Sequence, residues 1–325
     1  MRHGTGLGLE AARHFVRLNA AKVVLACRSV ERGEAARRDI EASQKRDGVV
    51  EVWQLDLGSF ESVKDFAARA SSQLGRLDVL LNSASILVHD FAIVEGHETM
   101  MTVNIISTFL LTVLLFPLLR QTAVRHNVTP HVTIVSSDGA FMASHPSSRT
   151  HSPIHAGVSL TLPTQKAFFP ERKADHIFNT LKLNKNCLER YNTTKLLQLL
   201  LMRKLAAAAD ARSGEGQGHH HHVIVNALNP GLCRTQLFRR SFWPLSWGVW
   251  LAFAVFGREP EMGSRTLLAA ACSGEDMHGR WMTDCRLQVW PGLMRGEEGE
   301  RLADKAWAEL GEILEGIEPG VMGNV

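Results

Sequence analysis

Tyrosine is nearly absent from this sequence, since Tyr191 is the only one among 325 residues. Cysteine is also scarce: the five cysteines are scattered, and no two are spaced as Cys-x-x-Cys. That pattern argues against a disulfide framework and favours reduced thiols in a cytoplasmic protein. An excess of one charge is lacking too, because 36 basic and 33 acidic residues leave a net charge of +3. This balance gives no basis for nucleic-acid binding.

The N-terminus lacks the apolar core of a signal peptide, and no internal repeat is visible. Residues 99–119 are strongly apolar, but polar residues interrupt them, and they are too short for a clear membrane span of about 20 apolar residues. We expect a buried helix there, packed against a sheet and against a second subunit. A homodimer through the helices near 101–119 and 191–209 is therefore expected.

Apolar runs alternate with helical patterns along the first half of the chain. Short apolar runs at 21–28, 49–57 and 77–82 are typical of buried parallel strands, and residues 131–136 and 223–228 repeat the pattern. Amphipathic or charged stretches of helical length separate the runs. This order predicts an α/β fold with helices on both faces of a parallel sheet, in one domain over 1–325.

Three glycines, Gly4, Gly6 and Gly8, lead into the first helical pattern, where Leu7 stands between two of them. Such a loop lets backbone N–H groups approach a pyrophosphate at a helix N-terminus; a flexible glycine-rich terminus is the alternative. A strand is missing before this loop, and in a doubly wound sheet that strand is central. We therefore expect a Rossmann-type, three-layer α/β/α sheet that lacks its first, central strand.

Arg28 closes the run at 21–28. A basic residue at this strand end suits the 2′-phosphate of NADP, whereas an acid would bind the ribose hydroxyls of NAD. A solvated charge at a strand end is the alternative interpretation of Arg28.

Tyr191 and Lys195 stand four residues apart in an expected helix, so both side chains lie on one face. A nearby ammonium favours the phenolate and lowers the pKa of the tyrosine. Such a tyrosine can exchange a proton with an alcohol or carbonyl oxygen. Taken alone, the pair also fits an ordinary surface helix.

Two segments interrupt the regular pattern. Residues 140–176 are rich in serine, histidine and proline and predict a long inserted loop; its histidines lack metal-ligand spacing, so no metal is expected. Residues 236–258 are aromatic and apolar, with two arginines near their start. We interpret them as a lid over an apolar substrate, and peripheral membrane contact through 242–256 is the second interpretation.

Seven features occur in an order that resembles the short-chain dehydrogenase/reductase family over nearly the whole chain. They are Thr5-Gly-Leu-Gly8, Asp56, Asn82-Ser-Ala-Ser85, Asn104, Ser137, Tyr191-x-x-x-Lys195 and Pro230-Gly-x-x-x-Thr235. The C-terminal region is similar to a retinol-dehydrogenase-like fungal branch, many members of which serve secondary metabolism.

The resemblance implies a catalytic tetrad of Asn104, Ser137, Tyr191 and Lys195. Tyr191 would be the acid/base, Ser137 would orient the substrate oxygen, and Lys195 would lower the tyrosine pKa and bind ribose. Asn104 would anchor a water in a proton relay.

The remaining motif residues would bind the cofactor. Asp56 would meet the adenine, Asn82 would line the cofactor path, and Thr235, after Pro230, would bond the nicotinamide amide.

Three departures from the family pattern qualify this assignment: the absent first strand, Ser85 in place of a glycine, and a 54-residue interval between Ser137 and Tyr191. The sequence thus predicts an NADP(H)-dependent oxidoreductase acting on a hydrophobic carbonyl or alcohol. The alternative is an N-terminally truncated or inactive relative that acts as a binding protein.

Overall fold

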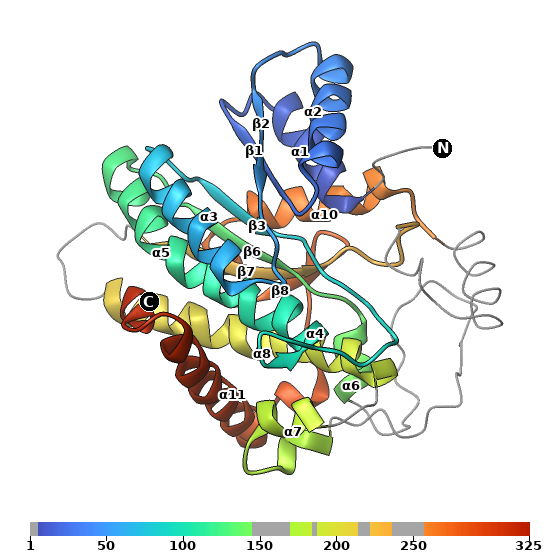
Figure 1. Ribbon diagram of the computed structural model, residues 1–325, viewed down its shortest axis with the longest axis vertical. Helices are drawn as coiled ribbons and strands as arrows, with labels where there is room; N and C mark the ends of the chain where they lie inside the picture. The colour runs from blue at the N-terminus through green and yellow to red at the C-terminus, as the bar shows by residue number, and fades with distance from the viewer. Residues whose placement is uncertain (1–5, 145–169, 184–186, 214–221, 236–256) are drawn as a thin grey trace.

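The computed structural model describes residues 6–144, 170–183, 187–213, 222–235 and 257–325 (Figure 1). Gly4, most of the expected insertion and nearly all of the expected lid, with its membrane-contact segment 242–256, lie outside these residues. The insertion begins in the short helix α6 (Gly139–Ser144) and contains the 3-10 turn η2 (Pro170–Lys173) near its end, where a loop was expected. The helix α7 (Ile177–Leu183) follows it.

Parallel strands dominate the sheets, as expected from the apolar runs. One sheet has the order β3-β6-β7-β8-β9, in which the last pairing alone is antiparallel. Its strands are β3 (Val79–Asn82), β6 (His131–Val135), β7 (Ile224–Asn229), β8 (Trp281–Thr283) and β9 (Arg286–Leu287). The strands β1 (Val23–Cys27) and β2 (Val50–Gln54) form a separate parallel pair, and β4 (Ile93–Val94) forms a small hairpin with β5 (His97–Glu98).

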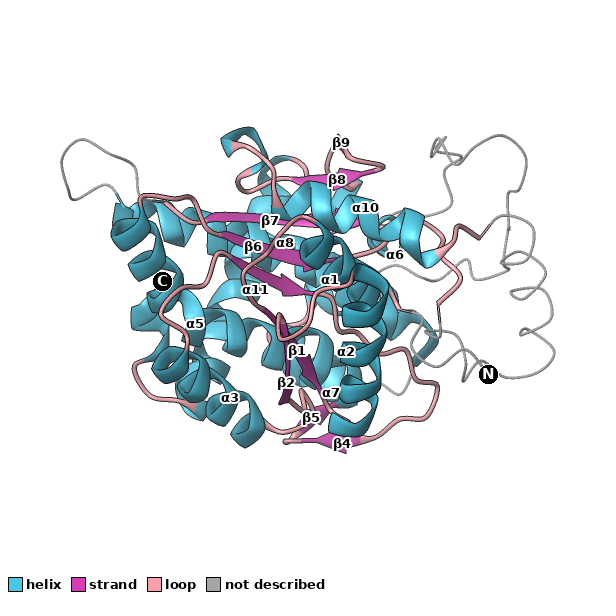
Figure 2. Cartoon of the chain, turned by 90° about the horizontal axis from the view of Figure 1, so that it is seen from above, coloured by secondary structure: helices cyan, strands magenta, loops and turns pink. Residues whose placement is uncertain are grey.

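The strand order breaks at the place of the first strand of a doubly wound sheet. In such a sheet the strands lie side by side in the order third, second, first, fourth, fifth, sixth. Here β2 and β1 take the third and second places, and β3, β6 and β7 take the fourth to sixth places, with a break where the first strand would lie. Figure 2 shows the pair β1–β2 set apart from β6, β7 and β8. Within the described residues no strand lies between β1 and β3. The predicted Rossmann-type α/β fold is confirmed, and the missing central strand stays a prediction.

The strands on either side of the break are less buried than the central strands of the larger sheet. Every residue of β6 and β7 is buried, as in a strand covered on both faces. No residue of β1 or β3 reaches that degree of burial. The two strands beside the break are thus less covered than β6 and β7.

Helices form a layer on each side of the strands (Figure 1). On one side α1 packs against α10, and α10 contacts β6 and β7; on the other α3 packs against α5, and α8 lies on β7. The longer helices are α1 (Leu7–Arg17), α2 (Val30–Gln44), α3 (Phe60–Gln73), α5 (Ser107–His126), α8 (Cys187–Ser213), α10 (Pro260–Ala271) and α11 (Gly296–Ile317). The short elements are α4 (Thr99–Met101), the π-helical turn η1 (Thr102–Ile106) and the 3-10 turns η4 (Glu275–Met277), η5 (Gly292–Met294) and η6 (Val321–Asn324).

Side-chain caps fix where several of these helices begin. Ser29 accepts a hydrogen bond from the backbone N of Arg32 at the start of α2, and Ser59 caps α3 in the same way through Ser62. Asn127, in the left-handed conformation, ends α5. The starts of α2 and α3 and the end of α5 therefore follow from local sequence.

The apolar stretch Thr99–His126 is a core helix in this fold. By length and composition it is apolar enough to cross a membrane, yet 89% of its most apolar window is buried inside the protein. The chain itself covers the helices that suggested a dimer, because α11 packs on α8 and η6 packs on α5. The homodimer stays a prediction.

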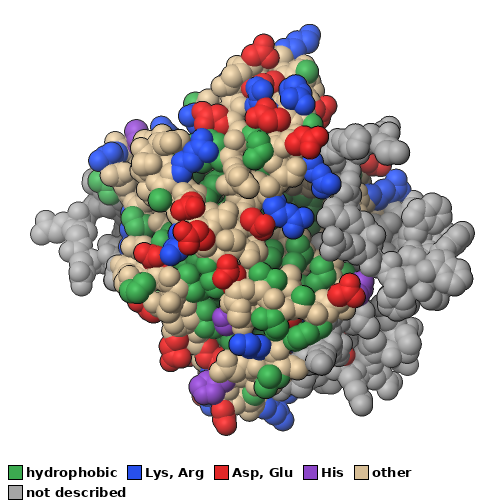
Figure 3. All heavy atoms as spheres, in the orientation of Figure 1, with side chains coloured by type: hydrophobic (Ala, Val, Ile, Leu, Met, Phe, Trp, Pro, Cys, Tyr) green, Lys and Arg blue, Asp and Glu red, His purple; other side chains and the backbone are tan. Residues whose placement is uncertain are grey.

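The visible surface carries no single-sign patch. Figure 3 shows acidic and basic side chains intermixed over the described part of one face. This agrees with the balanced composition of the chain.

Candidate active site

Tyr191 and Lys195 lie on α8 beside the carboxyl end of β6. Both are buried, with exposed fractions of 8% and 1%. Lys195 Nζ lies 5.4 Å from the centroid of the tyrosine ring. Ser137, which follows β6, lies near enough to the tyrosine side chain for its hydroxyl to lower the pKa of the phenol. The structure thus brings three of the four tetrad residues together although they come from distant parts of the chain.

Close packing between α6 and α8 places Ser137. A Cβ on Gly139 would come within 2.5 Å of the side chain of Asn192, so glycine permits the approach. Ser137 Oγ accepts a hydrogen bond from the backbone N of Gly139 at 3.2 Å. The neighbouring Ser136 donates its Oγ hydrogen to the carbonyl of Lys195 at 3.0 Å. The segment at the end of β6 therefore contacts α8 on both sides of Ser137, through Ser136 and through Gly139.

The tyrosine ring lies among apolar side chains. It clusters with buried Met100, and a group of partly buried residues packs against the two: Ile86, Leu87, Val88 and Phe91. Burial raises the pKa of Tyr191 to about 12, although the hydrogen bond from Ser137 lowers it. The sequence predicted a lowered pKa, and that direction is wrong for this structure because loss of water outweighs the partners of the phenol.

Lys195 is deeply buried and held by uncharged acceptors. Its Nζ donates to the carbonyl of Val135 at 2.9 Å and to Gln198 Oε1 at 3.0 Å. Burial lowers the pKa of Lys195 to about 7. Loss of water around each group is the main cause of both shifts.

Asn104 lies in the π-helical turn η1 and is fully buried. Its side chain holds the backbone of Ile86, accepting from N at 2.9 Å and donating to O at 3.0 Å, and it donates to Thr194 Oγ1. Its backbone carbonyl accepts a hydrogen bond from Gln198 Nε2 at 2.9 Å. A π-helical turn within an α-helix commonly marks a functional site. Asn104 thus connects the turn η1 to the segment at Ile86 and to the helix α8, which carries Tyr191 and Lys195.

Sequence reasoning missed Gln198 and the buried pair Glu98–Arg190. Arg190 Nε lies 3.7 Å from Glu98 Oε2, with both side chains almost entirely buried. Glu98 also accepts from the backbone N of Met100 and Met101. A polar residue set among leucines, as Gln198 is, was the signal available in the sequence.

The glycine loop meets the strand that follows the break. Gly6 precedes α1 in an extended conformation and gives it no side-chain cap, so the first N–H groups of the helix, at Leu7 and Gly8, have no such acceptor. A Cβ on Gly8 would lie 2.7 Å from Ser83 Oγ. Glycine is thus required for the close approach of α1 to the turn after β3.

The other expected cofactor residues lie at strand ends or in turns. Arg28 is exposed after β1. Asp56 accepts from the backbone N of Gly58 and so shapes the turn before α3. Asn82 donates to Thr112 Oγ1 on α5. Their roles toward a cofactor stay predictions.

Pro230 and Thr235 belong to the loop after β7. Asn229, before Pro230, donates to Asp138 Oδ1 at 2.6 Å and accepts from the backbone N of Gly231. Pro230 is buried, and the backbone N of Thr235 bonds the carbonyl of Cys233. The Asn229–Asp138 bond holds this loop next to Ser137, as the resemblance requires.

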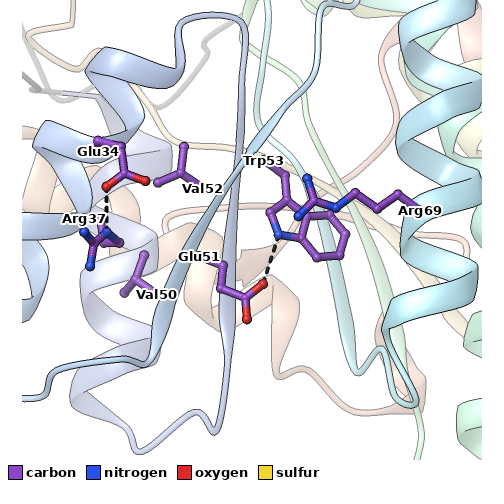
Figure 4. A pocket seen from close by; sticks show the side chains of 7 residues that line it. All are labelled: Glu34, Arg37, Val50, Glu51, Val52, Trp53 and Arg69. Atoms are coloured by element: carbon purple, nitrogen blue, oxygen red, sulfur yellow. Dashed lines mark hydrogen bonds and ion pairs between the residues drawn. The ribbon is translucent and has the colours of Figure 1, made fainter.

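A pocket between α2, β2 and α3 is separate from these groups (Figure 4). It is lined by Glu34, Arg37, Val50, Glu51, Val52, Trp53 and Arg69. The charged side chains of this pocket interact with one another or with Trp53. Arg37 forms an ion pair with Glu34, and Glu51 accepts a hydrogen bond from Trp53 Nε1. Arg69 Cζ lies 4.0 Å from the centroid of the Trp53 ring. The pocket holds none of the tetrad residues.

Comparison with known proteins agrees with this geometry. The family described as short chain dehydrogenase matches residues 3–147. The short chain dehydrogenase/reductase dmxR8 of Cryptosporiopsis sp. (strain 8999) is 37% identical over 320 residues, 98% of this chain and 90% of that protein. The short chain dehydrogenase atnD of Emericella nidulans is 40% identical over 285 residues, 86% of this chain and 81% of that protein.

Solved structures share the fold. The Pseudomonas aeruginosa RhlG/NADP active-site complex aligns with a TM-score of 0.56 at 20% identity, over 86% of this chain and 90% of that chain. Since identity of 37% extends over 98% of the chain, this protein belongs to the short-chain dehydrogenase/reductase family.

Proposed function

We propose that this protein is an NADP(H)-dependent oxidoreductase that interconverts a carbonyl and an alcohol on a hydrophobic small molecule. The observation that carries the proposal is the placement of Ser137 beside the buried Tyr191, whose pKa it lowers, with Lys195 one helical turn further on. A phenol whose pKa is about 12 is fully protonated near neutral pH and is therefore ready to act as an acid.

Protein side chains carry out the proton transfer to the substrate. Tyr191 donates its hydroxyl proton to the carbonyl oxygen of the substrate, and Ser137 holds that oxygen beside the phenol. When Lys195 is charged, it stabilises the phenolate that remains. The cofactor, when bound, supplies the hydride for the carbonyl carbon.

The cofactor end fits NADP in three respects. The uncapped N-terminus of α1 suits a pyrophosphate, and the approach of Gly8 to Ser83 needs a glycine. The exposed Arg28 after β1 suits a 2′-phosphate. The RhlG structure was solved with NADP, which supports the same choice here.

An apolar substrate is supported by the walls near the phenol. Met100 and the Ile86, Leu87, Val88 and Phe91 side chains gather around Tyr191, and apolar surface favours apolar ligands. The fungal origin of the matched relatives favours the expected role in secondary metabolism, and the retinol-dehydrogenase-like placement remains a proposal.

Calorimetric titration with NADPH and with NADH, followed by NADPH oxidation across a panel of apolar ketones and aldehydes, tests this function. We expect NADPH to bind more tightly than NADH and at least one apolar carbonyl to be reduced. Arg28→Ala should remove most of the preference for NADPH while sparing NADH binding. Lack of NADPH binding together with lack of turnover would refute the proposal.

A binding role without turnover is the second candidate. It is favoured by the break between β1 and β3 in the described residues, because that break adjoins the glycine loop. This candidate predicts ligand binding that Tyr191→Phe leaves unaltered and no NADPH oxidation with any carbonyl.

A further inference from the structure

Gln198 is a polar side chain inside an apolar part of α8. It is 1% exposed, and the leucines on both sides of it in the sequence are fully buried. An amide without partners in such surroundings costs free energy, so its hydrogen bonds account for its presence. Both ends of this amide are engaged within the candidate active site.

The carbonyl end of the amide meets the catalytic lysine. Gln198 Oε1 accepts from Lys195 Nζ at 3.0 Å, and Val135 O accepts from the same nitrogen at 2.9 Å. Residues three apart lie on one face of a helix, so α8 presents Gln198 directly to Lys195. An ammonium has three donors. In its charged form, Lys195 therefore has one donor left for the phenol and the cofactor ribose.

The nitrogen end of the amide meets the π-helical turn. Gln198 Nε2 donates to the backbone carbonyl of Asn104 at 2.9 Å, while the side chain of Asn104 is bonded to Ile86 and Thr194. Lys195, Gln198 and Asn104 thus form a continuous chain of hydrogen bonds made by protein groups alone.

We propose that Gln198 is a positioning residue, whose amide fixes Lys195 Nζ at one end and the Asn104 carbonyl at the other. This inference rests on the proposed function, in which Lys195 supports turnover. Because its amide bonds both groups directly, Gln198 sets the position and the charge of Lys195.

The electrostatic effect of Gln198 has a definite sign. Its Oε1 is the negative end of a dipole and favours the charged form of Lys195, against the burial that lowers the pKa of this lysine. Gln198→Glu puts a carboxylate in the same place and should raise the lysine pKa. Gln198→Met keeps the length of the side chain but removes the acceptor, and should lower it.

The test measures two quantities in the full-length protein: the pH profile of kcat, and the pKa of Lys195 by lysine-selective ¹⁵N NMR, with Lys195→Met identifying the signal. In Gln198→Met we expect the alkaline limb of the profile to move down by about one pH unit and kcat to fall roughly tenfold. In Gln198→Glu the alkaline limb of the kcat profile should move to higher pH, and the pKa of Lys195 should rise. The control Leu201→Met, a volume-conserving change on the same helix, should alter neither.

An unchanged Lys195 pKa and an unchanged pH profile in folded Gln198→Met overturn the proposal. If that variant does not fold, Gln198→Glu decides the question through the same two readings. If the wild-type protein neither binds NADPH nor turns over a carbonyl, the proposed function fails separately. The Lys195 pKa still decides the role of Gln198 in that case, because the NMR measurement needs no substrate.

Discussion

Burial shifts the proton equilibria of the phenol and the lysine amine in opposite directions. The pKa of Tyr191 is raised to about 12 and that of Lys195 is lowered to about 7, because burial disfavours the charged form of each group. Near neutral pH the tyrosine keeps its proton, while the lysine is close to its midpoint. The pair is thus set to donate a proton rather than to accept one.

Removing the phenol hydroxyl should stop the chemistry and spare the fold. Tyr191→Phe keeps the ring that packs on Met100 but lacks the acid, so we expect kcat to fall by at least about 100-fold. NADPH affinity, measured by calorimetry, should stay within about threefold of wild type. Turnover that survives in this variant would show that another group donates the proton.

Lys195 should make stability depend on pH. The unfolded chain keeps the lysine proton up to its usual pKa of 10.5, whereas the folded chain releases it near pH 7. Between these values the unfolded state binds more protons, so stability rises with pH. From pH 7 to pH 9 the free energy of unfolding, measured with urea, should rise by about 2 kcal/mol from this group.

The matched control for that slope is Lys195→Met, which has no amine to titrate and should lose the rise. Tyr191 contributes in the opposite sense only above pH 10, because its folded pKa exceeds its unfolded one. Identical pH slopes for the two proteins between pH 7 and pH 9 would contradict the assignment.

At the scale of elements, the buried pair Glu98–Arg190 joins the start of α4 to α8, one residue before Tyr191. Asn104 and Tyr191 therefore depend on two elements whose relative position this pair helps to set. Glu98 also caps the backbone N of Met100 and Met101.

Glu98→Gln should reveal this coupling. Loss of one partner leaves the other charge buried, so we expect the free energy of unfolding to fall by about 3 kcal/mol, together with a lower kcat. Glu297→Gln is the control, since its pair with Arg301 is exposed and should cost less than about 0.5 kcal/mol. Equal urea midpoints for the two variants would show that the buried pair is not coupled to stability.

Sequence patterns were sufficient for most of the parallel strands and insufficient for the contacts between elements. The apolar runs predicted β1, β2, β3, β6 and β7, because buried parallel strands need continuous apolar sequence. The spacing of Tyr191 and Lys195 predicted a shared helix face. The direction of the Tyr191 pKa shift could not be predicted, since it depends on how much water the fold excludes.

The same limit explains why Gln198 was overlooked. Its partner Asn104 is 94 residues away in the sequence, and no local pattern connects a glutamine in a leucine-rich helix to a carbonyl in a π-helical turn. The contents of 145–169 and 236–256 lie outside the described residues, so the insertion and lid stay predictions.

At the scale of the whole molecule, the break in the sheet leaves β1 and β3 each with one strand neighbour in the described residues. Their free edges carry N–H and C=O groups that a further strand would satisfy.

A designed extension should test that edge. Five β-branched apolar residues followed by a short turn, fused before Met1, should raise the Tm by at least about 5 °C if they pair with both strands. The control carries the same residues with a central proline, which cannot complete the ladder. Equal melting temperatures for the two fusions would mean that the edges are closed to a new strand.

The composition of the chain makes Tyr191 a spectroscopic reporter of the candidate active site. Because Tyr191 is the sole tyrosine, growth on fluorotyrosine would place a single fluorine label in the protein, at the buried phenol beside Ser137. Every ¹⁹F resonance would then describe the acid group itself, free of background from elsewhere in the sequence. Protonation, cofactor arrival and substrate entry would all be read from one line in a spectrum.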